Sequence, residues 1–142
     1  MITPPIHELV PHTGSMCLIE RIIAWDATQI LAATETHRHA DNPLLRHGRL
    51  DTVHLCEYGA QAMAVHGGLL AHGEGRRAPL GFLVSLRDVW LASVPVQDCA
   101  GELEVRALRL FGDGNGWQYE FTVSHDSAVL ASGRVAVVLR RD

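Results

Sequence analysis

The chain has 142 residues with 12 basic and 16 acidic side chains, and its formal net charge is -4. This length predicts one domain over residues 1–142, and the charge excludes a nucleic-acid binder that depends on bulk electrostatics. All 12 basic residues are arginines, which excludes a lysine nucleophile or Schiff base.

The composition also argues against a membrane or disulfide-stabilised protein. No run approaches the ~18 apolar residues of a membrane span, and the first residues lack the features of a signal peptide. Cys17, Cys56 and Cys99 lie far apart and form no CxxC pair, so we expect buried small side chains rather than disulfides or a zinc knuckle. We therefore expect a cytoplasmic protein.

The first part of the chain predicts a helical turn and a hairpin. Pro4–Val10 can form one short turn of helix, because proline is tolerated at a helix start and Pro11 ends it. Cys17–Trp25 is predicted as a strand, with Gln29–Thr36 as its partner across the turn at Asp26–Thr28.

The loop His37–Arg49 is rich in histidine and arginine. Six of the nine histidines lie between His37 and His72. A polar loop and helix ends explain them. A metal site is the alternative, because His37 and His39 would share one face of a strand. We predict no metal site, since no carboxylate or cysteine stands at tight spacing.

Residues Leu50–His72 predict the one long helix. An apolar stripe at helical spacing comprises Val53, Cys56, Ala60, Met63, Gly67 and Leu70. His54, Glu57 and Gln61 fall together on another side. A polar line on a helix suited to burial needs partners, so Glu57 is the first candidate for chemistry. A solvated position, or an ion pair with a neighbouring arginine, is the alternative.

The rest of the chain predicts four antiparallel strands. The runs are Leu80–Val94, Gly101–Phe111, Trp117–Ser124 and Ala128–Leu139. The glycine-rich Gly112–Gly116 is a hairpin turn rather than a phosphate loop, because no helix or lysine follows it. One apolar helix and a sheet long enough to curl around it predict an α+β fold.

Four blocks resemble a known family. They are Leu9–Glu20, Asn42–Leu45, Glu57-Tyr58-Gly59-Ala60-Gln61 and Pro79-Leu80-Gly81-Phe82-Leu83. In this order they resemble the hot dog fold 3-hydroxyacyl-acyl-carrier-protein dehydratases, most closely the branch associated with aryl-polyene pigments. The resemblance implies a hot dog fold and a hydro-lyase that needs no cofactor and acts on substrate carried on phosphopantetheine.

The resemblance also implies residue roles. Glu57 corresponds to the acid that protonates the leaving hydroxyl, and apolar surroundings would raise its pKa. The family's Gly-His-Phe-Pro is missing, so His47 is the first candidate for the base and His39 the second. His54 and His12 follow in that order. Substrate contacts are expected at Gly48, Gln61 and His54.

The resemblance implies two kinds of partner. Acidic acyl carrier protein would meet Arg46, Arg49, Arg76 and Arg77, for which solvated loop positions are the alternative. A second hot dog subunit would complete the site, most simply as a homodimer, with a tetramer or a heterodimer as the alternatives.

Two other functions compete with dehydration. A thioesterase of the same fold is suggested by His66-Gly67-Gly68, although this motif lies late in the helix rather than before it. A non-catalytic hot dog subunit that binds an acyl carrier or completes a heterodimer is suggested by the missing Gly-His-Phe-Pro.

Overall fold

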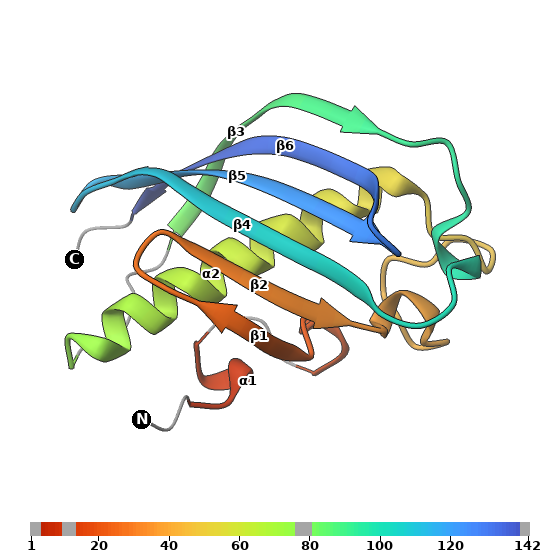
Figure 1. Ribbon diagram of the computed structural model, residues 1–142, viewed down its shortest axis with the longest axis horizontal. Helices are drawn as coiled ribbons and strands as arrows, with labels where there is room; N and C mark the ends of the chain where they lie inside the picture. Colours follow the sequence, from red (N-terminus) through yellow and green to blue (C-terminus); the bar gives the residue numbers. More distant parts are fainter. Residues whose placement is uncertain (1–3, 10–13, 76–80, 140–142) are drawn as a thin grey trace.

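The computed structural model describes residues 4–9, 14–75 and 81–139, with the backbone alone at 81 and 82. A six-stranded antiparallel sheet curls around one long helix (Figure 1). The elements are α1 (Ile6–Leu9), β1 (Arg21–Trp25), β2 (Gln29–Thr34), α2 (Leu55–Gly73), β3 (Gly81–Leu91), β4 (Leu103–Gly112), β5 (Gly116–His125) and β6 (Ala128–Leu139). The strand order is β1-β2-β4-β5-β6-β3. The predicted α+β hot dog architecture is therefore confirmed.

Side chains of turn residues fix the two predicted hairpins. Asp26 Oδ1 accepts hydrogen bonds from the backbone N–H groups of Thr28 and Gln29, at 2.8 and 3.0 Å. Asp113 Oδ1 does the same for Asn115 and Gly116, at 2.7 and 3.0 Å. Short polar side chains stabilise tight turns in this way, which sets the register of the strands on either side.

Four predicted strand boundaries were wrong by two residues or more: the starts at Cys17 and Gly101 and the ends at Thr36 and Val94. The predicted strand from Cys17 begins only at Arg21, because the backbone of residues 16–18 is hydrogen-bonded to the side chain of Gln61 instead of a strand. The second strand ends at Thr34 because the chain turns there into the short 3-10 helix η2 (Thr36–Arg38).

The long helix begins later than predicted. Residues from Leu50 form a capped 3-10 turn, η3 (Thr52–His54), and α2 follows directly. Figure 1 shows α2 lying across the concave side of the sheet, where its residues lie close to strands β2, β4, β5 and β6. No helix among the described residues is long and apolar enough to cross a membrane.

The predicted apolar stripe is buried only in part: Met63 and Gly67 are buried, but the positions near the start of the helix are not. Val53 is 53% exposed, and Cys56 and Ala60 are only half-buried. Fully buried positions outside the stripe are Leu55, Tyr58, Ala62 and Val65. Small and apolar residues surround this helix on every side, so periodicity alone could not identify the face that meets the sheet.

Glycine lets α2 approach the sheet closely. A Cβ at Gly59 would lie 2.3 Å from Phe121 Cγ, and one at Gly67 would lie 2.4 Å from an indole carbon of Trp117. Phe121 is buried in the same core cluster as the helix residues. Both glycines therefore set the distance between helix and sheet.

Replacing Gly59 with alanine is expected to lower the free energy of unfolding by about 1–3 kcal/mol, because the buried Phe121 has no free space to move into. Gly73→Ala is the matched control, since it lies in the same helix and its added Cβ would meet nothing within 4 Å. That variant should be unchanged or up to about 1 kcal/mol more stable. Urea titrations measure both, and equal stability of the two variants would contradict this account of the packing.

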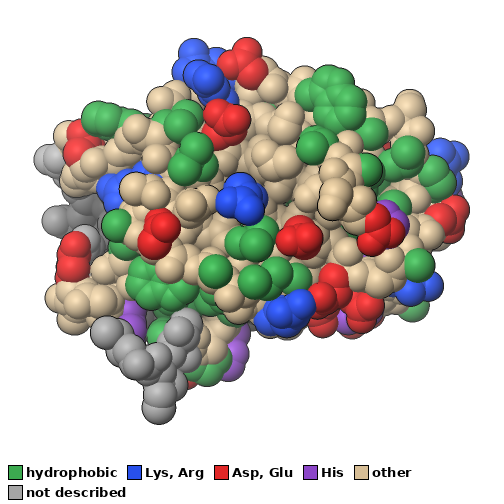
Figure 2. All heavy atoms as spheres, in the orientation of Figure 1, with side chains coloured by type: hydrophobic (Ala, Val, Ile, Leu, Met, Phe, Trp, Pro, Cys, Tyr) green, Lys and Arg blue, Asp and Glu red, His purple; other side chains and the backbone are tan. Residues whose placement is uncertain are grey.

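Strand β3 leaves apolar side chains uncovered at the edge of the sheet. Within the described part of the chain it pairs only with β6, and Leu83 and Trp90 are 58% and 53% exposed. Val84, Leu86, Val89 and Leu91 are also exposed. Figure 2 shows hydrophobic side chains, interspersed with charged ones, along the upper edge of the view where β3 runs. A long apolar edge strand is a common site of pairing with another chain.

Candidate active site

Glu57 lies in the first turn of α2 and its side chain is half-buried. Gln61 Nε2 donates a hydrogen bond to Glu57 Oε1 at 3.1 Å. The two residues are four apart on the helix, so the structure brings them together as their spacing predicts. The carboxyl group is thus held at a defined position beside the core.

Gln61 is buried and uses both ends of its amide within the protein. Its Oε1 accepts from Leu18 N at 2.8 Å, and its Nε2 donates to Met16 O at 2.7 Å as well as to Glu57. These contacts anchor the segment before β1 to the helix. They also place Gln61 to orient the Glu57 carboxyl group, while substrate contact by Gln61 stays a prediction.

His54 belongs to the cap of the helix. Asp51 N donates to His54 Nδ1 at 3.1 Å, and the Asp51 side chain accepts from the backbone N–H of His54. This reciprocal pair is a capping box, which satisfies donors at the start of a helix. One ring nitrogen of this half-buried histidine is therefore used by the cap.

His47 and Gly48 form the tip of a tight turn. Arg46 and Arg49 exchange two backbone hydrogen bonds, of 2.9 and 3.0 Å, across it. Both central residues have positive φ, 54° at His47 and 73° at Gly48, as in a type I′ turn. His47 is exposed, and the turn explains why a glycine follows it.

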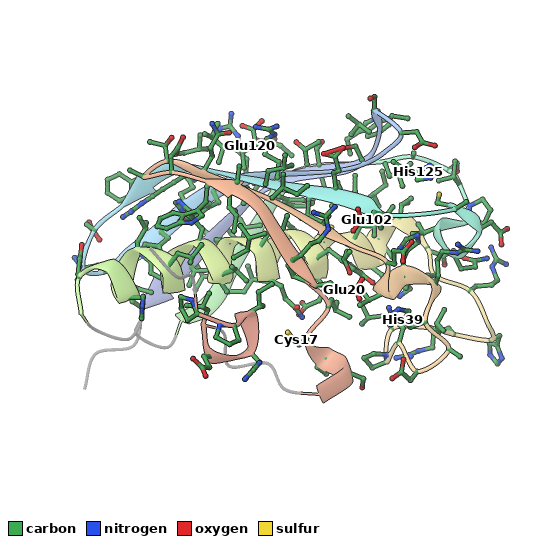
Figure 3. All side chains as sticks on the ribbon, turned by 60° about the horizontal axis from the view of Figure 1, so that its bottom comes forward. Cys17, Glu20, His39, Glu102, Glu120 and His125 are labelled. Carbon is green, nitrogen blue, oxygen red and sulfur yellow. The ribbon has the colours of Figure 1, made fainter. Side chains whose placement is uncertain are left out.

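His39 is also exposed and lies in the same loop before the helix. Figure 3 shows it beside the N-terminal end of α2, on the side away from the sheet. Its backbone closes local turns, donating to Thr36 O at 3.1 Å and accepting from Asn42 N at 3.1 Å. His12, Arg76 and Arg77 lie outside the described residues.

A buried polar network next to Glu57 was not foreseen from the sequence. Asn42 Nδ2 donates to Tyr58 OH at 2.9 Å, and Tyr58 OH lies 3.0 Å from Thr36 Oγ1. Thr36 Oγ1 also donates to Leu18 O at 2.7 Å. The only signals in the sequence were the Asn42-Pro43 block and a tyrosine directly after the candidate acid.

Two histidines are part of the core. His66 Nε2 donates to Asp26 O at 2.7 Å, and His66 Nδ1 accepts from Tyr119 OH at 2.5 Å. His37 Nε2 donates to Cys99 O at 2.8 Å. Burial lowers the pKa of both histidines and raises the pKa of the Tyr119 hydroxyl.

The metal alternative drawn from His37 and His39 depended on a shared strand face, and the strand ends before both residues. Over the described ranges, no group of three or more His, Cys, Asp or Glu side chains could hold a metal ion.

A groove of about 370 Å³ lies between the start of the chain and β1. Its walls are formed by Pro4, Pro5, Ile6, Glu20, Arg21, Ile22, Ile23, Ala24 and Trp25. None of the residues predicted to act in catalysis or to bind substrate lines this groove. The groove is therefore separate from the candidate site at Glu57 and the loop before α2.

Solved structures of low sequence identity share the fold. The chain is similar to the dehydratase heterocomplex ApeI:P from Xenorhabdus doucetiae (TM-score 0.87, 23% identity, covering 99% of this chain and 94% of that one). It is also similar to AziG from S. sahachiroi (TM-score 0.60, 21% identity, covering 94% and 99%). A third similar structure is thioesterase HI1161 from Haemophilus influenzae (TM-score 0.61, 12% identity, covering 84% and 77%). These likenesses establish the hot dog fold.

Comparison with curated protein sequences found no match. A family model described as ApeP dehydratase matches residues 4–142, which include Glu57, the histidine-bearing loop and all six strands. The chain therefore belongs to the ApeP-like dehydratase family.

Proposed function

We propose that this protein takes part in dehydrating 3-hydroxyacyl thioesters on acyl carrier protein, giving trans-2-enoyl thioesters for fatty-acid, polyketide or aryl-polyene biosynthesis. Membership of a dehydratase family supports the reaction class. The observation that carries the site is a half-buried Glu57 on the central helix, held by a hydrogen bond from Gln61.

The reaction needs a base and an acid but no cofactor. A base takes the proton from the carbon next to the thioester carbonyl, and the electron pair forms the new double bond as the carbon–oxygen bond at C3 breaks. Glu57 gives its proton to the departing hydroxyl, which leaves as water. The proton held by the base then returns to the Glu57 carboxylate and resets the site.

The base is assigned to the loop before α2. His47 and His39 are both exposed there, where a substrate can reach them. His47 remains the first choice and His39 the second, because one ring nitrogen of His54 is used by the helix cap. Arg46 and Arg49 flank His47 and supply positive charge for a carrier phosphate.

A second hot dog subunit is expected to pair along β3. The exposed apolar edge strand supports this, because it offers both unpaired backbone groups and hydrophobic side chains. The similar structure from Xenorhabdus doucetiae is described as a heterocomplex of ApeI and ApeP. We therefore propose two alternative assemblies, a homodimer and a heterodimer with another hot dog subunit.

Incubation with a 3-hydroxyacyl carrier substrate tests the function. We expect the absorbance of a conjugated enoyl thioester to rise without release of free thiol. Free thiol would instead identify the thioesterase, for which the likeness to HI1161 is the supporting observation. A chain that binds the carrier protein but forms neither enoyl thioester nor free thiol, both alone and in complex with a partner subunit, would be a non-catalytic subunit.

A further inference from the structure

A continuous path of hydrogen bonds leads from Glu57 towards the loop that carries the candidate bases. Gln61 Nε2 donates to Glu57 Oε1, and Gln61 Oε1 accepts from Leu18 N at 2.8 Å. The carbonyl of the same Leu18 accepts from Thr36 Oγ1 at 2.7 Å. Leu18 thus joins the helix to the first residue of the loop, which is defined here as residues 36–49.

Tyr58 closes this path from the other side. Its hydroxyl accepts from Asn42 Nδ2 at 2.9 Å and lies 3.0 Å from Thr36 Oγ1. Because a carbonyl oxygen can only accept, an assignment that satisfies each group has Thr36 donating to Leu18 and Tyr58 donating to Thr36. Asn42 Nδ2 also donates to Thr36 O at 2.8 Å, and Asn42 Oδ1 accepts from Leu44 N at 2.9 Å.

The path is buried throughout. Leu18 and Tyr58 are fully buried, and Thr36, Asn42 and Gln61 are almost so. Buried polar groups that lose a partner are costly, so a network of this kind has little freedom to rearrange. A phenylalanine would fill the volume of Tyr58 without needing polar partners. Packing alone therefore does not account for the Tyr58 hydroxyl, and the better explanation is that this hydroxyl holds loop 36–49 in place.

We propose that Tyr58 is a positioning residue: through Thr36 and Asn42 it fixes loop 36–49, and with it His39 and His47, relative to Glu57. This inference rests on the proposed dehydratase function. Tyr58 itself touches neither substrate nor the reacting atoms in this scheme. Its effect is to hold the two ends of the proton-transfer machinery at a constant separation.

Tyr58→Phe tests the proposal, with Tyr119→Phe as its matched control. Both tyrosines are buried and each loses a hydroxyl hydrogen bond, but Tyr119 contacts His66 rather than the loop. The variants are assayed in the form in which the wild-type chain is active, either alone or with its partner subunit. There, Tyr58→Phe should lower kcat about tenfold or more and change KM by less than about twofold. Tyr119→Phe should keep kcat. Hydrogen exchange in loop 36–49 should quicken only in Tyr58→Phe.

A second pair keeps the test valid if Tyr58→Phe folds poorly. Thr36→Val removes the hydroxyl that joins Tyr58 to Leu18, whereas Thr36→Ser keeps it. We expect a lower kcat and faster hydrogen exchange in loop 36–49 for the valine variant, and wild-type values of both for the serine variant. The proposal is overturned if Tyr58→Phe and Tyr119→Phe have equal kcat, or if Thr36→Val and Thr36→Ser do. This holds even if hydrogen exchange in loop 36–49 differs between them.

The outcome also separates this inference from the proposed function. A wild-type protein without turnover, alone and with its partner subunit, contradicts the dehydratase assignment. Loop exchange then decides the positioning role by itself. Faster exchange confined to Tyr58→Phe supports that role, and equal exchange in both tyrosine variants overturns it.

Discussion

Replacing Glu57 with glutamine is expected to lower kcat for enoyl formation by about 10²- to 10⁴-fold, the usual contribution of a general acid. The amide cannot supply the proton that the departing hydroxyl needs. Glutamine nevertheless keeps a side-chain oxygen that can accept the hydrogen bond from Gln61 Nε2. Stability should therefore change little, and steady-state kinetics with thermal melting measure the two effects separately.

Glu104→Gln is the control for the change in charge. Glu104 is exposed on β4, where the burial pattern alternates and places it on the outer face of the sheet. This variant should keep wild-type kcat. Wild-type turnover by Glu57→Gln would mean that another group protonates the leaving hydroxyl and that the proposed role of Glu57 is wrong.

The architecture could be predicted because local patterns agreed with the overall fold. Alternation in β4 and β5 marked strands with one covered face, and the observed burial alternates in the same way. The turn at Asp26 was equally clear, since its side chain bonds to backbone groups two and three residues ahead. Signals of this kind act over a few residues and are visible in a single sequence.

Errors in the fold arose where distant residues compete with local preference. Cys17–Trp25 contains enough apolar side chains for a strand, but its first residues are held by Gln61, 43 positions from Leu18. The apolar stripe predicted on α2 identified only part of its buried surface, for a related reason. Which side of a nearly uniform helix meets the sheet depends on glycines such as Gly59 fitting against Phe121.

In the candidate site, too, contacts between near neighbours in the sequence could be predicted and contacts between distant residues could not. Glu57 and Gln61 could be paired from their spacing on one helix, and they are hydrogen-bonded in the structure. The roles of the histidines could not be sorted in this way. His66 is assigned to the core by Asp26 and Tyr119, which lie 40 and 53 positions away. A histidine's function depends on such partners, and its own sequence neighbours do not reveal them.

We expect the free energy of unfolding to fall as the pH drops below about 6.5. The slope should reach about 1.4 kcal/mol per pH unit for each of the two core histidines, His37 and His66. Both are fully buried, and burial is the main cause of their lowered pKa. The charge of Arg109 lowers the pKa of His66 further, while the hydrogen bond to Asp26 O opposes the shift.

The sign follows from proton uptake by the unfolded chain. Its histidines have the ordinary pKa of 6.5, whereas the folded pKa of both core residues is lower. The stabilisation is therefore fully present above pH 6.5 and is lost as the pH falls through the folded pKa. Protonation of His66 Nδ1 would remove the acceptor of the Tyr119 hydroxyl. His37 Nδ1 is buried without a hydrogen-bond partner among the described residues, so a proton there would have no acceptor.

Urea titrations between pH 7.5 and 5 measure this slope. Asp26 does not titrate in this pH window, because hydrogen bonds from Thr28 lower its pKa from 3.8. Its contribution to the free energy of unfolding is lost only at lower pH. His66→Gln and His37→Gln should each be less stable at pH 7.5 but show a shallower decline. His47→Gln, which removes an exposed rather than a buried imidazole, is the control. Parallel curves for all four proteins would mean that the core histidines do not cause the acid sensitivity.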